Sequence, residues 1–478
     1  MNKVWEIDLN FFKKKLKNNS TQLPEYIKSD LVNGIIEKLK GTNNFSNNYF
    51  ENIVETNLKR IDNAINNIFN NKKGLLIFGK VQSGKTINSI FTTAMLFDKG
   101  YDIVILLCGT TNILKKQNSD RFEEFKFHFN DNGFIKMKTL ADKNIVSFID
   151  DIGNRNFKSK IFIPILKEKT NLENLINIVN TSVFINKCKI AIIDDESDIA
   201  SINYNFMEKE QEERKIPVLI KNLLSKVENS NYIAVTATPY NNIIFNRQIK
   251  DEGIKIDYII GLENDLNYHG FNFFHQNKSK YIIEVKNKEM KKNIISLIEI
   301  FKENYNSYIE KKENFSILIN TSVSTTEHSK INRILKKELE ILSKELDLLS
   351  DNYSINIYNS KSEDEISFSK KFNFIIGGNL LSRGITFPNL VLELITNFNE
   401  DGFNPSTMIQ RCRWFGYRDK VKEIIKILMP SDLSKFYSCI RNVENMLFEA
   451  IGNGIEVDNS FVEKLAGEFE REGIKWNA

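Results

Sequence analysis

The stretch "GLLIFGKVQSGKT", residues 74–86, decides the fold class of this chain. Its first five residues form a short apolar run typical of a buried strand, and "TINSIFTTAMLF", residues 86–97, has apolar residues at helical spacing. Residues 79–86 between them have the spelling G-x-x-x-x-G-K-T. A strand, a glycine-containing loop and a helix in this order predict a P-loop on an α/β fold.

The predicted P-loop has a defined chemistry. Backbone N–H groups of the loop and the positive end of the helix dipole would face the phosphates of ATP. Lys85 would reach the β- and γ-phosphates, and Thr86 would hold Mg²⁺. The alternative is a tight turn with an exposed lysine. The residues predicted to bind the nucleotide here are Gly79, Gln82, Ser83, Gly84, Lys85 and Thr86.

The composition limits the function classes. The 478 residues suggest about two to four domains, and 41% hydrophobic with 27% charged residues is typical of a soluble globular protein. No apolar run reaches a membrane-spanning length, and the first residues lack a signal-peptide core. We therefore expect a cytoplasmic protein with no membrane partner.

Charge and cysteine content add little to this. A net charge of +4 is too small to indicate nucleic acid by itself, although a local basic groove remains possible. The four cysteines, Cys108, Cys188, Cys412 and Cys439, have no pair spacing, so neither a disulfide framework nor a zinc site is expected.

Alternating strands and helices divide the chain. Further strand candidates lie at residues 102–109, 161–166, 189–194, 232–238, 315–320, 373–378, 390–395 and 424–429. Helical stretches between them predict two α/β lobes with parallel sheets. We expect a helical N-terminal extension (1–70), a first lobe (71–262), a connecting segment (263–300), a second lobe (301–440) and a C-terminal helical segment (441–478). The stretch at 261–280 looks like a loop-rich connection.

The second motif is "IAIIDDESD", residues 190–198. A buried strand that ends in acids delivers carboxylates to the edge of the sheet where ligands bind in open α/β folds. In this D-E-x-D spelling, Asp195 would hold Mg²⁺, largely through water, and Glu196 would orient or deprotonate the attacking water. The alternative is a solvated acidic turn.

A third motif, "VTATPYNN" at residues 235–242, also follows a strand candidate. T-A-T-P after a D-E-x-D box is typical of the coupling motif of superfamily 2 helicases. The hydroxyls of Thr236 and Thr238 would sense the acidic motif and pass the nucleotide state to the second lobe. A Thr-Pro pair also often just ends a strand.

The second half of the chain supplies two arginine motifs. "GGNLLSRGITF", residues 377–387, has Arg383 and Gly384 at its centre, and Gly384 is assigned to the nucleotide site. "QRCRWFGYR", residues 410–418, offers Arg413 and Arg418 as arginine fingers for the charge on the transferring phosphoryl group, with Arg413 preferred. The alternative for either arginine is an ion pair on a helix surface. The aromatic residues Trp414, Phe415 and Tyr417 of the second motif are expected to pack rather than to stack on bases.

Together these motifs resemble the Z-one domain family, whose members are bacterial, archaeal and phage proteins often named as endonucleases. The segments that carry the resemblance are "VQSGKT", "GTTNILKKQNSDRF", "IIDDESDIASIN", "YIAVTATPYNNI", "GGNLLSRGITF" and "QRCRWFGYR", which span about residues 70–450 in the family's order. The resemblance implies two RecA-like lobes of a superfamily 2 helicase-type ATPase, commonly encoded beside restriction or phage-defence genes. By position it assigns Gly79, Gly84, Lys85, Thr86, Asp195, Glu196, Arg413 and Arg418 to the nucleotide.

Two departures from the family's pattern concern the arginine finger. Cys412 stands where the family usually has glycine, and Ser406-Thr407 replaces an Asp-Thr pair. Many relatives are also longer, so we expect accessory domains that they carry to be missing here. This puts in question whether the ATPase core acts without a partner.

The nuclease chemistry that the family's usual name suggests is poorly supported by the residues. The four histidines form no H-N-H arrangement. Glu284 and Lys286 in "IIEVK" have E-x-K spacing, but a chain with 62 acidic and 66 basic residues contains such triplets by chance. We therefore predict no nuclease activity in this chain.

Three functions stay open at this point. The favoured one is an ATP-driven translocase or remodeller of nucleic acid, DNA before RNA, within an anti-phage or restriction system. Strand contacts would come from residues 109–111 and from the loop near Ser322 and Ser324. The alternatives are an ATP-controlled switch that gates a partner nuclease, and an ATP-dependent endonuclease acting near Glu284 and Lys286. Strandedness, polarity, the adenine pocket and the oligomeric state are not indicated.

Overall fold

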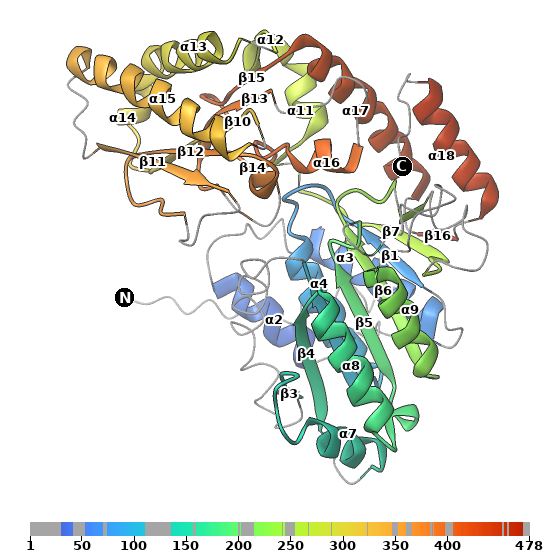
Figure 1. The fold of residues 1–478 in the computed structure, drawn as a ribbon. Coiled ribbons are helices and arrows are strands. Elements are labelled where there is room, and N and C mark those ends of the chain that lie inside the picture. The colour runs from blue at the N-terminus through green and yellow to red at the C-terminus, as the bar shows by residue number, and fades with distance from the viewer. Residues whose placement is uncertain are drawn as a thin grey trace, which may run out of the picture.

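A computed structural model of the chain describes residues 30–41, 53–69, 74–109, 135–155, 159–198, 201, 215–240, 242–243, 254–265, 267–287, 289–322, 324–346, 352–359, 366–382, 385, 387–396, 405–451, 454–456 and 458–471. These residues form two lobes, each built on a parallel sheet with helices packed against it (Figure 1). The predicted α/β class with two RecA-like lobes is confirmed.

The first lobe holds an eight-stranded sheet in the order β16-β7-β1-β6-β5-β2-β4-β3. All of its neighbouring strands are parallel except β16, which runs antiparallel to β7. Its strands are β1 (Leu75–Phe78), β2 (Ile103–Cys108), β3 (Ile135–Met137), β4 (Lys160–Leu166), β5 (Ile190–Asp195), β6 (Ser230–Thr236), β7 (Tyr258–Gly261) and β16 (Ile455–Glu456).

Helices cover both faces of this sheet, as its continuous apolar strands require. On one face Leu75 and Ile77 pack with α2 (Asp30–Gly41), α3 (Glu55–Phe69) and α4 (Lys85–Asp98). On the other face Leu76 and Phe78 belong to the core that includes α7 (Ile145–Gly153), α8 (Lys169–Thr181) and α9 (Lys215–Lys226). A 3₁₀ turn, η3 (Ile185–Lys187), precedes β5.

The second lobe holds a six-stranded parallel sheet in the order β11-β12-β10-β13-β15-β9. Its strands are β9 (Ile282–Glu284), β10 (Phe315–Asn320), β11 (Tyr353–Tyr358), β12 (Phe372–Gly377), β13 (Leu390–Ile395) and β15 (Lys426–Met429). The remaining helices are α11 (Phe271–Gln276), α12 (Lys278–Tyr281), α13 (Met290–Glu303), α14 (Tyr305–Ile309), α15 (Thr325–Glu345), η6 (Asn379–Ser382), α16 (Pro405–Gln410), α17 (Ser431–Ile451) and α18 (Asn459–Arg471).

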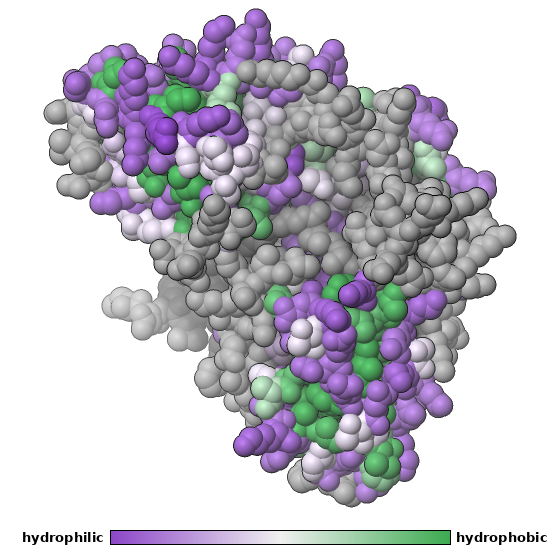
Figure 2. Space-filling model, viewed as in Figure 1, coloured by the Kyte–Doolittle hydropathy of each residue, from purple (hydrophilic) through white to green (hydrophobic). Residues whose placement is uncertain are grey.

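Polar and apolar surfaces follow this layout. Hydrophilic residues dominate the outer side of the second lobe near α13 and α15 (Figure 2). Among the described residues, no helix is long and apolar enough to cross a membrane.

Two short strand pairs bridge sequence-distant parts of the chain. β14 (Gly416–Tyr417) of the arginine motif pairs antiparallel with β8 (Tyr268–His269), which follows the first lobe. β16, which follows α17, joins the first sheet. The chain after the second lobe therefore returns to the first.

All nine predicted strands correspond to strands of the structure. The prediction of a loop-rich connection at 261–280 is wrong. Helices α11 and α12 occupy residues 271–276 and 278–281. The rings of Phe271 and Phe274 are buried beside Phe415, with centroids 4.7 and 5.9 Å away. The polar composition of this stretch indicates a loop, but the aromatic packing stabilises it as helices. The predicted lobe boundaries stay a prediction.

Candidate nucleotide site between the lobes

The P-loop has the backbone geometry of a phosphate cradle. Gly84 at the start of α4 has φ +90°, and Gln82 has φ +56°, both left-handed. A Cβ on Gly79 would lie 2.7 Å from Cγ of Lys85 and 3.0 Å from Leu262, so a larger residue would displace the lysine. Ser83 is buried in the loop, and Thr86 lies in the first turn of the helix.

Lys85 is held at the centre of the site. Its Nζ donates to the carbonyl of Lys80, 3.0 Å away. Burial lowers the pKa of Lys85 to about 8, and Arg413 acts in the same direction. The carboxylates of Asp195, Glu196 and Asp198 act in the opposite direction. A half-buried cation close to three acids, at a helix N-terminus, is suited to a polyanion.

The acidic motif lies at the carboxyl end of β5, as predicted. Oδ1 of Asp195 accepts a hydrogen bond of 3.1 Å from the N–H of Glu196. Glu196 itself has φ +50°, a conformation that a non-glycine residue keeps only when its surroundings hold it. Both carboxylates act on the charge of Lys85, so the structure brings the first two motifs together.

The threonines of the third motif meet the last acid of the second. Oγ1 of Thr236 donates to Oδ1 of Asp198 at 2.7 Å, and Oγ1 of Thr238 donates to Oδ2 at 2.9 Å. All three side chains are buried. The two threonines therefore contact the acidic motif, which is the arrangement that a sensing role requires.

Arg413 comes from the second lobe and lies beside the P-loop. Its guanidinium donates to the carbonyls of Ser382, at 3.1 Å, and of Ile385. Its carbon Cζ lies 5.8 Å from the centre of the Phe387 ring. Only 5% of the residue is exposed, so the alternative of an ion pair on a helix surface is wrong for this arginine.

Arg418 is also buried, among backbone carbonyls. Its guanidinium donates to the carbonyls of Phe387, Arg413, Trp414 and Phe415 at 2.6–3.3 Å. Burial and the charge of Arg413 lower the pKa of Arg418 to about 10. The surface ion pair is wrong here as well. Arg418 thus has acceptors on all three guanidinium nitrogens, and three of the four carbonyls belong to its own motif.

Gln82 joins the two lobes. Its Nε2 donates to the carbonyl of Arg413 at 3.2 Å, and its Oε1 accepts from Nη2 of Arg418 at 3.0 Å. Gly416, with φ +111°, allows this approach, because a Cβ there would lie 3.2 Å from Oε1 of Gln82. The sequence predicts Gln82 as a nucleotide contact and does not indicate this second role.

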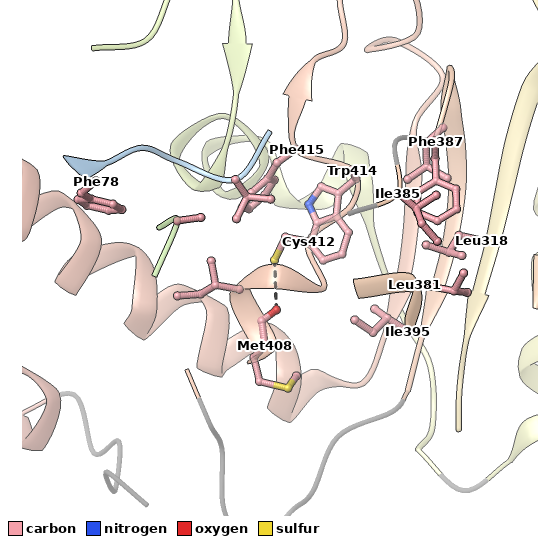
Figure 3. Packing of buried hydrophobic residues seen from close by; sticks show 14 of the residues in the cluster. Phe78, Leu318, Leu381, Ile385, Phe387, Ile395, Met408, Cys412, Trp414 and Phe415 are labelled. Atoms are coloured by element: carbon pink, nitrogen blue, oxygen red, sulfur yellow. Dashed lines mark hydrogen bonds between the residues drawn. The ribbon is translucent and has the colours of Figure 1, made fainter. Parts of the chain in front are cut away.

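The arginine motif is packed from both sides. Figure 3 shows Trp414, Phe415 and Cys412 between Phe78 of the first lobe and Phe387 with Ile385 of the second. Trp414 and Phe415 are buried, so their predicted packing role is confirmed. Tyr417 is 40% exposed and contacts the ring of Tyr268 at 5.9 Å.

Sequence reasoning missed three buried charged residues near the site. Lys167 follows β4 and pairs with Asp194 at 2.5 Å. Glu393 lies in the middle of β13, and neither of its carboxyl oxygens has a hydrogen-bond partner among the described residues. Glu444 of α17 lies 3.9 Å from Nζ of Lys80 in the P-loop. An isolated acid in the apolar run "LVLELI" was a signal for Glu393; the other two had none.

Some predicted residues are not placed. Arg383, Gly384 and residues 110–111 lie outside the described residues. Glu284 is half-exposed on the edge strand β9 and pairs with Lys278, and Lys286 pairs with Glu289. In the described part of the chain, no group of three or more His, Cys, Asp and Glu residues is arranged to hold a metal ion.

The comparisons with known proteins agree with this geometry. Residues 275–460 match the family model of the Z1 domain. The predicted resemblance to the Z-one family is thereby confirmed, and the matched Z1 region includes the whole arginine motif. No curated protein matches the chain.

The solved structures show the same fold. The chain is similar to Mss116p bound to ssRNA and AMP-PNP, with a TM-score of 0.50 at 13% identity over 89% of this chain and 78% of that one. The DUF1998 helicase MrfA bound to DNA also scores 0.50, at 11% identity, over 89% of this chain and 56% of that one. S. cerevisiae Dbp5 bound to RNA and ADP BeF3 scores 0.48 at 12% identity, over 92% and 96%. At these identities the two likenesses with a TM-score of 0.50 show the fold alone, two α/β lobes in one chain.

Proposed function

We propose that this chain is an ATP-dependent translocase or remodeller of nucleic acid, with DNA favoured over RNA, that works in the cytoplasm in an anti-phage or restriction system. The observation that carries the proposal is the position of Arg413. This residue of the second lobe lies close enough to the P-loop for its charge to lower the pKa of Lys85. A hydrolysis site shared by two lobes ties ATP turnover to their relative movement.

The residues present fit ATP and Mg²⁺. Glycine at position 79 leaves the room that a Cβ would fill, and the left-handed backbone at Gln82 and Gly84 shapes the loop for phosphate oxygens. The Thr86 hydroxyl and the Asp195 carboxylate are the oxygen ligands that Mg²⁺ prefers. When bound, ATP would supply the phosphoryl group and Mg²⁺ the positive charge that offsets the charge on its oxygens.

The chain's own groups divide the work. Lys85 stabilises the phosphates, and Glu196 orients the attacking water. Arg413 supplies the arginine finger, because its charge acts on Lys85 from the second lobe. Arg418 holds the motif in shape. Asp198 with Thr236 and Thr238 relays the state of the acidic motif.

Two places would contact the strand. Gly109 follows β2, and Ser322 follows β10, so both lie at the carboxyl ends of parallel strands, where ligands bind in such sheets. Ser322 Oγ accepts from the N–H of Ser324, which caps α15. Backbone and hydroxyl groups of this kind bind phosphates without reading sequence. The resemblance to a family found beside restriction and phage-defence genes favours DNA.

The test is steady-state ATP hydrolysis by the purified chain, alone and with single-stranded DNA, duplex DNA or RNA, with Lys85→Ala as the control. We expect stimulation by DNA that the control lacks. A Lys85-dependent rate that no polymer changes would instead favour an ATP-controlled switch that gates a partner nuclease. DNA cleavage that survives in a Glu284→Ala, Lys286→Ala double variant would exclude that pair as a nuclease site.

A further inference from the structure

A buried lysine outside the nucleotide motifs touches the catalytic acid's backbone. Lys167 follows the last residue of β4 and is 2% exposed, with its side chain and that of Asp194 both fully buried. Lysine is almost never fully buried unless it is paired. Its pairing with Asp194 allows this burial and places the ammonium group next to the acidic motif.

The Lys167 ammonium group makes one ion pair and two hydrogen bonds around the acidic turn. Nζ lies 2.5 Å from Oδ1 of Asp194, 2.9 Å from the carbonyl of Asp195 and 3.1 Å from the carbonyl of Glu196. Two of these acceptors belong to the peptide groups that define the turn. The ammonium group thus holds the backbone of both predicted reacting carboxylates.

This hold acts where the backbone is strained. Glu196 has φ +50°, which costs a non-glycine residue free energy and persists only under external constraint. Lys167 bonds the carbonyl of that residue directly. Loss of the bond would let the Glu196 backbone relax and turn the carboxylate away from the water that it is proposed to orient.

The backbone of the same residue bonds a segment proposed to contact the strand. The N–H of Lys167 donates to the carbonyls of Cys108, at 3.0 Å, and Gly109, at 3.2 Å. Lys167 therefore bonds the end of β2 through its main chain and the acidic turn through its side chain. If nucleic-acid binding shifts Gly109, the single residue Lys167 connects that shift to Glu196.

We propose that Lys167 is a positioning residue that couples nucleic-acid binding to the orientation of Glu196. The inference rests on the proposed function, because it assigns a route by which the polymer stimulates hydrolysis at that site. A Lys167→Met variant keeps the length of the side chain and loses the ion pair and both hydrogen bonds.

The experiment measures ATP hydrolysis with and without saturating single-stranded or duplex DNA. Lys167→Met should lower the polymer-stimulated kcat about 10- to 100-fold, the scale on which ~1 Å misplacements act. The KM for ATP and the Kd for DNA should stay within about threefold of native, because the buried side chain of Lys167 is not among the groups proposed to contact either ligand. This split between kcat and KM separates positioning from general damage.

Three further variants keep the test decisive if Lys167→Met alone folds poorly. Lys167→Met with Asp194→Asn removes the buried unpaired carboxylate and should show the same loss of stimulation. Tyr232→Phe removes the hydroxyl that donates to Asp194 at 2.5 Å, yet spares the carbonyl contacts, and should keep stimulation. Lys169→Met changes a half-exposed lysine that pairs with Glu173 and should match native.

The outcomes separate the two proposals. A native chain that no polymer stimulates would overturn the proposed function and the coupling with it. A stimulated native chain, with the Lys167 variants stimulated equally, would overturn the coupling alone. Equal loss in Tyr232→Phe would also overturn it, because the effect would then come from general disturbance of the buried pair.

Discussion

Gln82 of the P-loop and Arg418 of the second lobe share a hydrogen bond of 3.0 Å across the nucleotide site, although 336 positions separate them in the chain. The second hydrogen bond of the same amide, to the carbonyl of Arg413, fixes the segment that carries the proposed finger. Tyr268 adds a third tie, since its hydroxyl donates to the carbonyl of Val81 at 2.6 Å. The P-loop therefore sets the register of the arginine motif.

Removal of the Gln82 amide should slow hydrolysis without abolishing ATP binding. Gln82→Gly suits the left-handed backbone and loses both bonds, so kcat should fall about 10- to 100-fold through misplacement of Arg413. Gln82→Asn tolerates the same backbone but is too short for the bridge, and should behave alike. Isothermal titration with ATP and steady-state kinetics measure the two effects. An unchanged kcat in both variants would contradict the proposed register.

ATP affinity should weaken as the pH rises through about 8, the pKa of Lys85. The phosphates need the ammonium form, and about nine-tenths of the group is protonated at pH 7 but only about one-tenth at pH 9, so affinity should fall about tenfold. Equilibrium binding at constant salt measures the slope. Lys85→Arg, which keeps its charge over this range, is the control and should show a flatter profile.

The two arginines should separate by their effects on rate and stability. Arg413→Gln should lower kcat roughly 10³-fold, as loss of an arginine finger does, with a smaller change in melting temperature. Arg418→Gln should destabilise the fold more strongly, by about 3–5 kcal/mol, because it removes a buried cation bonded to five acceptors. Kinetics and thermal denaturation on the same samples decide. The reverse pattern would make Arg418 the finger.

The buried carboxyl of Glu393 should make stability depend on pH. Burial raises the pKa of Glu393 well above its usual value, against the charges of Arg413 and Arg418. The native state then binds more protons than the unfolded state, so stability is greatest below the unfolded pKa and is lost as pH rises toward the folded one. The glutamine of Glu393→Gln cannot titrate. The melting temperature of this variant should therefore rise relative to that of the native protein as the pH increases from 5 to 8.

A second buried acid, Glu444, provides the comparison for the effect of Glu393 on the melting temperature. Burial also raises the pKa of Glu444, which Lys80 opposes. Glu444→Gln serves as the comparison, and identical melting profiles of native and Glu393→Gln would show that Glu393 does not carry the effect.

The sequence predicts those parts of the site that are local in the chain. The P-loop and the acidic motif each fit within nine residues, so spacing alone places Lys85, Thr86, Asp195 and Glu196. The second role of Gln82 depends on the contact between the two lobes, which no local sequence pattern indicates. Lys167 stands in "LKEK", which resembles a solvated charged turn. Nothing nearby in the sequence shows that the end of β4 lies close to the acidic turn after β5, with β2 between the two strands.

The same distinction holds for the fold. Apolar runs identify the central strands, since strands buried on both faces are continuously hydrophobic. The two-residue strands β8, β14 and β16 have no such signal, and only their distant partners define them. The sequence does not predict α11 and α12, because Phe271 and Phe274 are buried against Phe415, which lies far away in the chain.

The pairing of β16 with β7 has a consequence for synthesis at the ribosome. β7 is complete by residue 261, but its antiparallel neighbour arrives only at residues 455–456, nearly two hundred residues later. During that interval the nascent first lobe presents an uncovered strand edge, the feature that invites pairing with other chains. Production of the first lobe as an isolated fragment would prolong that exposure indefinitely, so fragments that include the returning segment are the ones to express.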